Sequence, residues 1–168
     1  MRAMFFVEGR FRLTNQMLSD LRAAGHFEGE AAALRRQGGW RGRKSPGYDL
    51  FASETQAIRL ATKASAKNIG AVPDVVNVAL WVLGHHKHDP DAWLLLGKAI
   101  IDGLKDAGLI RSDRFQVGVV AGRVVRSTAE EFSVRRYYEE ETGSRLPDCS
   151  GVVVGLDEAE ATVGVCRD

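Results

Sequence analysis

The feature that most constrains the fold is residues 75–83, VVNVALWVL, a segment without charge whose only polar side chain is Asn77. Apolar side chains on both faces of an extended chain are typical of a central strand that is covered on both sides. Hydrophobic periodicity predicts further strands over 4–8, 115–125 and 152–156, and helices over 16–24, 28–37, 53–68 and 92–107. We therefore expect one α/β (α+β) domain, residues 1–168, with helices packed on a mixed β-sheet.

Local signals mark several element boundaries. Ser53 and Gln56 have the spacing of a capping box, which predicts that a helix begins there. Residues 127–141 leave two alternatives open, since a cap at 127 and 130 would open a helix, whereas a strand over 132–138 fits nearly as well. The acidic C-terminal end, residues 157–168, is predicted to be a tail.

The composition is that of an ordinary globular protein. Hydrophobic residues make up 45% and charged residues 27% of the 168 positions, close to the average for soluble domains. We expect a cytoplasmic protein without a membrane contact, because residues 1–7 are too short for a signal peptide and no apolar run approaches the length of a membrane span. Cys149 and Cys166 form no CxxC pair, so both are expected to be reduced thiols.

The net charge of +1 conceals an asymmetry between the two parts of the chain. Residues 1–88 carry 13 Lys and Arg against 7 Asp and Glu, a net +6, whereas residues 89–168 carry 10 against 15, a net −5. The segment RRQGGWRGRKSPG contains five positive charges, four glycines, Trp40 and no acid. Because such a segment cannot pack a core, residues 35–48 are predicted to be a flexible arm along DNA phosphates, with the tryptophan stacked on a base. The alternative is an ordinary solvated loop.

Three acids are grouped around one predicted helix. The sequence DPD places a proline between Asp89 and Asp91, and proline biases the residue before it towards an extended backbone, in which residues two apart share a face. A glycine naturally ends the helix over 92–107, and a short turn then leads to Asp113. We expect the three carboxylates to meet around a divalent cation, which would offset their repulsion. The alternative is structural, with Asp91 as a helix N-cap and Asp89 as a solvated acid.

The ensemble of DPD, then GKAIIDGLKDAGLI, then SD, resembles the core of the RusA family of Holliday-junction resolvases (crossover junction endodeoxyribonucleases). The resemblance covers about Lys87 to Val125. It implies a RusA-like fold, Mg²⁺ as the cofactor with Mn²⁺ as a substitute, a four-way DNA junction as the partner, and a homodimer associated with the nucleoid. The implied function is resolution of the junction by paired phosphodiester hydrolysis in DNA recombination and repair.

The resemblance also implies roles for individual residues. The acidic triad of the family falls on Asp89, Asp91 and Asp113, which would be both catalytic and metal-binding, and its catalytic lysine falls on Lys98. Without the resemblance, Lys98 is interpreted as a surface lysine paired with Asp102. Together with the basic arm, the residues expected to contact DNA are Asn15, Arg35, Arg36, Trp40, Arg41, Arg43, Lys44, Lys87 and His88.

Two of these assignments have other interpretations. Thr14 or Asn15 would instead cap the helix over 16–24. The histidines at 85, 86 and 88 suggest a zinc site, but the only other histidine is His26, so we prefer polar or phosphate contacts for this cluster.

Several positions depart from the family pattern. The family commonly has Asn where this chain has Ala92, an acid where it has Ser112 and an arginine where it has His88, and about three more residues separate the second Asp from the lysine. These departures favour an alternative function, that of a catalytically impaired protein that binds junctions or branched DNA. A third hypothesis is a metal hydrolase that acts on a small molecule.

Overall fold

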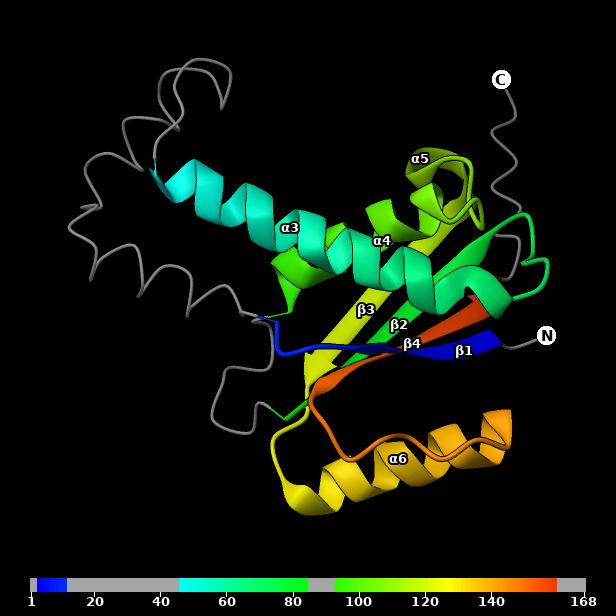
Figure 1. The fold of residues 1–168 in the computed structure, drawn as a ribbon. Coiled ribbons are helices and arrows are strands. Elements are labelled where there is room, and N and C mark those ends of the chain that lie inside the picture. Colours follow the sequence, from blue (N-terminus) through cyan, green and yellow to red (C-terminus); the bar gives the residue numbers. More distant parts are fainter. Residues whose placement is uncertain (1–2, 12–45, 85–92, 160–168) are drawn as a thin grey trace, which may run out of the picture.

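The computed structural model describes residues 3–11, 46–84 and 93–159 (Figure 1). Its elements, in chain order, are β1 (Ala3–Glu8), α3 (Pro46–Ser65), a 3₁₀ turn (Ala66–Asn68), β2 (Val76–Leu83), α4 (Leu94–Asp106), α5 (Asp113–Gln116), β3 (Val117–Val124), α6 (Thr128–Thr142) and β4 (Gly151–Glu158). The four strands form one mixed sheet in the order β1-β4-β2-β3. The predicted α/β (α+β) arrangement, a mixed sheet with helices packed on it, is confirmed.

β2 is a central strand of this sheet, as its apolar sequence predicts. It pairs antiparallel with β4 along its whole length, from Val76 opposite Glu158 to Leu83 opposite Gly151. On its other side it pairs in parallel with β3, while β1 adds antiparallel to the outer side of β4. Every second side chain of β2, beginning with Val76, is almost fully buried, which agrees with a strand covered by other elements.

Helices cover both faces of the sheet. α3 and α4 lie side by side on one face, and α6 lies on the other (Figure 1). The larger core lies between the sheet and the α3–α4 pair, and a smaller core under α6 includes Leu83, Val134 and Val153. Full burial of one large apolar side chain contributes about 1.5–3 kcal/mol. The α3–α4 layer, which buries more of them, therefore contributes most to the stability of the fold.

A bulge explains the one polar residue of the central strand. The β2–β3 register shifts between Val76 and Val78, and Asn77 Oδ1 accepts a hydrogen bond from the Val119 N–H at 2.9 Å. A Cβ on Gly118 would lie 2.8 Å from the same oxygen, so only glycine allows this approach. The Asn77 side chain thus takes the place of a backbone partner at the bulge.

α3 and α4 approach closely because a glycine of one helix faces a threonine of the other. Thr62 is completely buried, and its hydroxyl donates to the Ile58 carbonyl oxygen at 2.8 Å. A Cβ on Gly103 would lie 2.5 Å from Thr62 Cβ and 3.0 Å from the Arg59 carbonyl oxygen. The Arg59 guanidinium also joins the two helices, because it donates to the Asp106 carboxylate through contacts of 2.8–3.0 Å.

Three predicted boundaries near the ends of elements are wrong. α3 begins at Pro46 and not at Ser53, because proline fits the first turn of a helix. Residues 46–48 therefore belong to this helix and not to the predicted arm. β4 continues to Glu158, so Asp157 lies in the sheet and not in a tail, because pairing with β2 extends the strand to that point.

The segment after α4 also differs from the prediction. Residues 113–116 form the short helix α5, so the strand predicted over 115–125 begins at Val117. The helices predicted over 16–24 and 28–37 lie outside the described residues, as does the rest of the basic arm.

The ambiguous segment 127–141 is a helix, α6. Ser127 is its N-cap, and the Ser127 Oγ accepts a hydrogen bond from the Glu130 N–H at 3.1 Å. Glu130 Oε2 in turn accepts from the Arg126 N–H at 2.9 Å. The two hydrogen bonds satisfy the backbone N–H groups of Arg126 and Glu130 at the start of the helix. This capping arrangement therefore favours the helix over the strand.

We expect Gly103→Ala to destabilise the protein, although alanine normally stabilises a helix by about 1 kcal/mol relative to glycine. The added methyl group would meet Thr62 and the backbone of α3, and overpacking of this kind costs about 1–3 kcal/mol. Urea denaturation followed by circular dichroism measures the difference. Gly70→Ala is the control, because nothing lies within 4 Å of its added Cβ. Equal stability of the two variants would contradict the close packing of α3 against α4.

Candidate functional site

α4 turns a polar stripe outward and an apolar stripe towards the sheet. Lys98, Asp102 and Lys105 follow one another at helical spacing on the outer side, and Lys98 is exposed. Ile100 and Leu104, on the inner side, are completely buried. This division follows from the 3.6-residue period of the sequence, and it places charged groups along the outside of the crossover between β2 and β3.

Asp113 is held by the capped turn α5. Ser112 is the N-cap, and its Oγ accepts a hydrogen bond from the Arg114 N–H at 3.2 Å. The Gln116 side chain closes the turn, because its Oε1 accepts from the Ser112 N–H at 3.1 Å and from the Arg111 N–H. Asp113 is the first residue of this turn, where backbone N–H groups without helical partners are available to a carboxylate.

The Asp113 carboxylate is stabilised in its ionised form. A hydrogen bond from its own backbone N–H lowers the pKa of Asp113 below the usual 3.8, and Lys105, whose Nζ lies 3.4 Å from Asp113 Oδ1, lowers it further. The charge of Lys98 also contributes to the lowered pKa. The side chain of Asp113 is 46% exposed, so solvent screens the ion pair and the carboxylate stays accessible to a cation.

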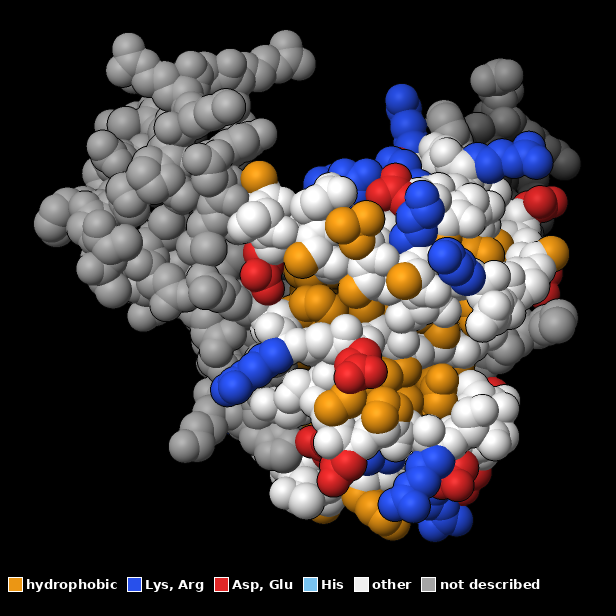
Figure 2. Space-filling view, in the orientation of Figure 1, with side chains coloured by type: hydrophobic (Ala, Val, Ile, Leu, Met, Phe, Trp, Pro, Cys, Tyr) orange, Lys and Arg blue, Asp and Glu red, His pale blue; other side chains and the backbone are white. Residues whose placement is uncertain are grey.

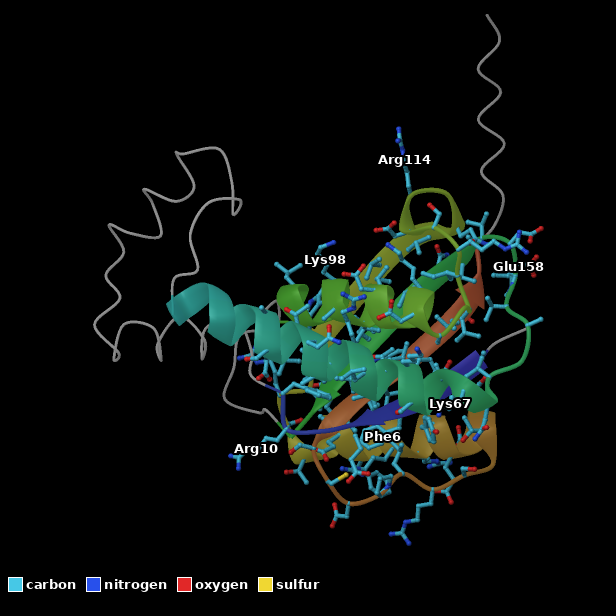
Figure 3. All side chains as sticks on the ribbon, turned by 45° about the horizontal axis from the view of Figure 1, so that its top comes forward. Phe6, Arg10, Lys67, Lys98, Arg114 and Glu158 are labelled. Atoms are coloured by element: carbon cyan, nitrogen blue, oxygen red, sulfur yellow. The ribbon has the colours of Figure 1, made fainter. Side chains whose placement is uncertain are left out.

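Lys98 lacks the ion pair that its interpretation as a paired surface lysine requires. Asp102 pairs with Lys105 instead, with 3.5 Å between Oδ1 and Nζ, so this lysine serves both Asp102 and Asp113. Among the described residues, no carboxylate pairs with Lys98. Figure 3 shows the Lys98 side chain extending away from the body of the protein on the same side as Arg114. Its charge is therefore available to a ligand.

Trp93 fixes the amino end of α4, where the DPD segment enters the helix. Its ring lies over β3, because a Cβ on Gly122 would come within 2.6 Å of it, and a Cβ on Gly97 within 2.9 Å. Trp93 also occupies the N-cap position of α4, without a side-chain capping hydrogen bond. The N-cap role that the structural alternative gives to Asp91 lies outside the described residues.

Most of the predicted site residues lie outside the described residues. They are the acids Asp89 and Asp91 and all the expected DNA contacts, namely Asn15, Arg35, Arg36, Trp40, Arg41, Arg43, Lys44, Lys87 and His88. Lys98 and Asp113 are described, and both lie along the outer side of α4. No three His, Cys, Asp or Glu side chains in the described part of the chain lie close enough to hold a metal ion. Asp113 is therefore the described member of the predicted acidic triad.

Asp102 and Lys105 belong to the same face but are absent from the predicted set of site residues. The sequence signal for them is their spacing of four and seven residues from Lys98, which places all three on one side of a helix. Spacing does not reveal that Asp113 folds back onto Lys105, because that contact depends on the turn after the helix.

The topology separates the two ends of the predicted site. β2 and β3 are parallel, so the carboxyl end of β2, which leads towards Asp89, and the amino end of β3, which follows Asp113, lie at opposite ends of the sheet (Figure 1). Eight strand residues span about 26 Å. α4 crosses this distance, and Lys98 lies about 6 Å along its axis from Leu94 and about 10 Å from Lys105. Asp113, which contacts Lys105, therefore lies near the end of α4 opposite the end that follows the DPD segment.

No protein-family model, curated protein or solved structure matches the chain. The resemblance of residues 87–125 to the RusA family therefore stays a prediction that rests on the motif. In the described part of the chain, no helix combines the length and the apolar composition needed to cross a membrane.

We expect Lys105→Met to raise the pKa of Asp113, because it removes the nearest positive charge. The pKa should stay below 3.8, since the backbone hydrogen bond and Lys98 remain. A lowered pKa in the folded state means that the charge of Asp113 stabilises the fold above about pH 4, and that this contribution is lost as the pH falls through the lowered pKa.

An NMR titration of the Asp113 carboxyl carbon measures this pKa. Lys63→Met is the matched control, because it removes an exposed lysine of α3 that has no part in lowering the pKa of Asp113. The same Asp113 pKa in the wild type and in Lys105→Met would contradict the ion pair.

Proposed function

We propose that the protein is a Mg²⁺-dependent, structure-selective endodeoxyribonuclease that resolves four-way (Holliday) junctions by paired phosphodiester hydrolysis. The observation that carries the proposal is the exposed Asp113 carboxylate, 3.4 Å from Lys105 Nζ and with its pKa lowered also by the charge of Lys98, on the outer side of the helix that follows the DPD segment. The resemblance of residues 87–125 to the RusA family supports the same activity, in DNA recombination and repair. Such a protein would act in the cytoplasm, in association with the nucleoid.

Asp89, Asp91 and Asp113 would hold the metal. Ionised carboxylates are hard oxygen ligands, which suit Mg²⁺, and Mn²⁺ accepts the same ligands. Asp113 fits this role because its pKa is lowered and its side chain is exposed. When bound, the metal supplies an activated water and neutralises charge during phosphodiester hydrolysis.

The two lysines of α4 have different proposed roles. Lys98 has no carboxylate partner among the described residues, so its ammonium group remains available to neutralise the charge that develops on the scissile phosphate. Lys105 instead lies against Asp113 and Asp102. It is a positioning residue that orients the Asp113 carboxylate.

A homodimer would give the protein two equivalent sites. Paired cleavage of a four-way junction cuts two opposed strands, and a two-fold dimer presents one site to each strand. The proposal therefore includes self-association of the chain, which sedimentation analysis at micromolar concentration would detect.

A second candidate is a catalytically impaired protein that binds junctions or other branched DNA. Ala92 and Ser112 favour it, because both replace residues that are common in the RusA family. Ser112 serves as the N-cap of α5, so its hydroxyl is committed to a structural hydrogen bond. A Mg²⁺ titration with a labelled junction separates the candidates, because binding without nicks at any Mg²⁺ concentration would favour the second.

Asp89→Asn, Asp113→Asn and Lys98→Ala are each expected to slow nicking of a labelled four-way junction on the order of a hundredfold or more. The Asp→Asn changes keep the size of the side chain but remove the charge that binds the metal. Junction binding in EDTA should survive in all three variants. Asp148→Asn is the matched control. It makes the same change of side chain at a fully exposed aspartate near Arg135 of α6, on the other face of the sheet.

The nicking assay compares a four-way junction, a fork and a linear duplex. A variant that nicks the junction at the wild-type rate would remove its residue from the proposed site. Equal nicking of the linear duplex would contradict structure selectivity while leaving metal-dependent hydrolysis in place.

Bound Mn²⁺ is expected to broaden the amide NMR signals of Lys98 and Asp113 in the wild type but much less in Asp89→Asn. The reason is that the proposed site joins acids from both ends of α4, so loss of one ligand weakens the metal binding of the others. The signal of Val134, in the core under α6, serves as the reference. Equal broadening in Asp89→Asn and in the wild type would contradict a site shared with Asp89.

A further inference from the structure

The outer side of α3, α4 and α5 carries an excess of positive charge. We call this surface the α3–α5 face and define it by residues 52–69 and 94–116. These two segments contain seven Lys and Arg, at 59, 63, 67, 98, 105, 111 and 114, against four Asp and Glu, at 54, 102, 106 and 113. The difference is a net charge of +3.

Two of these cations are matched to three of the acids. Arg59 binds Asp106 at 2.8 Å, and Lys105 lies 3.4–3.5 Å from both Asp113 and Asp102. In the middle of the face, each of these three acids thus has a cationic neighbour.

The other cations of the α3–α5 face are exposed around this middle. Lys63, Lys67, Lys98 and Arg111 are exposed, and within the described residues no carboxylate pairs with their side chains. Lys63 and Lys67 lie one helical turn apart, so they point from the same side of α3 and its 3₁₀ extension. Arg114 is exposed as well and extends from α5 in the same direction as Lys98 (Figure 3).

The opposite side of the protein has a different distribution of charge. Residues 126–150, which contain α6, carry four Arg against six Asp and Glu, a net −2. There, Arg135 pairs with Glu131 at 2.7 Å and Arg136 with Glu140 at 2.8 Å. Figure 2 shows Lys and Arg gathered over α4, α5 and the C-terminal half of α3, whereas around α6 they lie next to Asp and Glu. The positive charge is therefore a property of one face.

We infer that the α3–α5 face binds the phosphate backbone of a duplex DNA arm, with Lys63, Lys67 and Arg111 as contacts on either side of α4. This inference rests on the proposed function and names the surface that would bring DNA to it. Duplex DNA carries one negative charge per about 1.7 Å of its axis. Several exposed cations, spread over the helical layer, can therefore each contact a different phosphate. A strand bound there would pass over Lys98 and Asp113.

The test removes two charges from this face and two from the opposite side. The first variant combines Lys63→Gln with Lys67→Gln, and neither position belongs to the proposed catalytic set. The matched control combines Arg126→Gln with Arg145→Gln, two exposed cations at the two ends of α6. Both variants lose the same net charge, so any difference between them reports on position.

Binding of the full chain to a labelled duplex and to a labelled four-way junction is measured in EDTA over a range of salt concentrations. For the Lys63→Gln, Lys67→Gln variant we expect affinity to fall on the order of tenfold near 0.1 M salt. The plot of log K against log salt should become less steep by about 1.8, since each lost phosphate contact removes about 0.9. The control should keep the wild-type slope.

Three results would overturn the inference. They are an unchanged slope in the Lys63→Gln, Lys67→Gln variant, an equal loss in the control, and equally tight binding of the wild type to phosphatidylserine vesicles or to an RNA duplex. Junction nicking in Mg²⁺ by the same variant decides the proposed function separately. If the Lys63→Gln, Lys67→Gln variant nicks a saturating junction and keeps the wild-type binding slope, DNA binding by the α3–α5 face is contradicted and the proposed nuclease activity stands. If the variant shows the reduced slope but the wild type does not nick the junction, the nuclease activity is contradicted and DNA binding by this face stands.

Discussion

The parallel pairing of β2 with β3 is the constraint on which the rest of the structure depends. Parallel neighbours cannot be joined by a tight turn, so the chain has to cross one face of the sheet between them. α4 makes this crossing and packs beside α3 over the larger core. Because one side of α4 is committed to the core, its polar stripe faces outward along the whole crossing. The fold thus creates the outer surface that carries Lys98 and the Lys105–Asp113 pair.

The charges on this surface are arranged for orientation more than for stability. The Asp113–Lys105 pair is exposed, and exposed pairs contribute little to the free energy of unfolding. Its effect is to hold one carboxylate in a fixed place. Arg59 and Lys105 pair with the neighbouring acids, and the surrounding lysines and arginines give the α3–α5 face its net positive charge.

The rigid parts of the structure support this arrangement. Trp93 over Gly122 ties the start of α4 to β3, and Thr62 against Gly103 ties α4 to α3. The capped turn at Ser112 places Asp113 relative to the last turn of α4. Sites built on packed helices are held more precisely than sites on loops. The two contacts, of Trp93 with Gly122 and of Thr62 with Gly103, therefore fix the backbone positions of Lys98 and Lys105 on α4.

The sequence by itself determined the central strand and the helix after the DPD segment, because the hydrophobic period is a local pattern. The candidate capping pair at Ser127 and Glu130 left a helix and a strand open for residues 127–141, and the structure decided for the helix. The roles of Lys98 and Asp113 come from the resemblance of residues 87–125 to the RusA family and stay a prediction. Tertiary structure alone decided the start of α3 at Pro46, the pairing of Asp102 with Lys105 in place of Lys98, and the contact of Lys105 with Asp113. Those features depend on how separate elements pack and how the chain turns between them. The hydrophobic repeat within a single helix or strand carries no information about either.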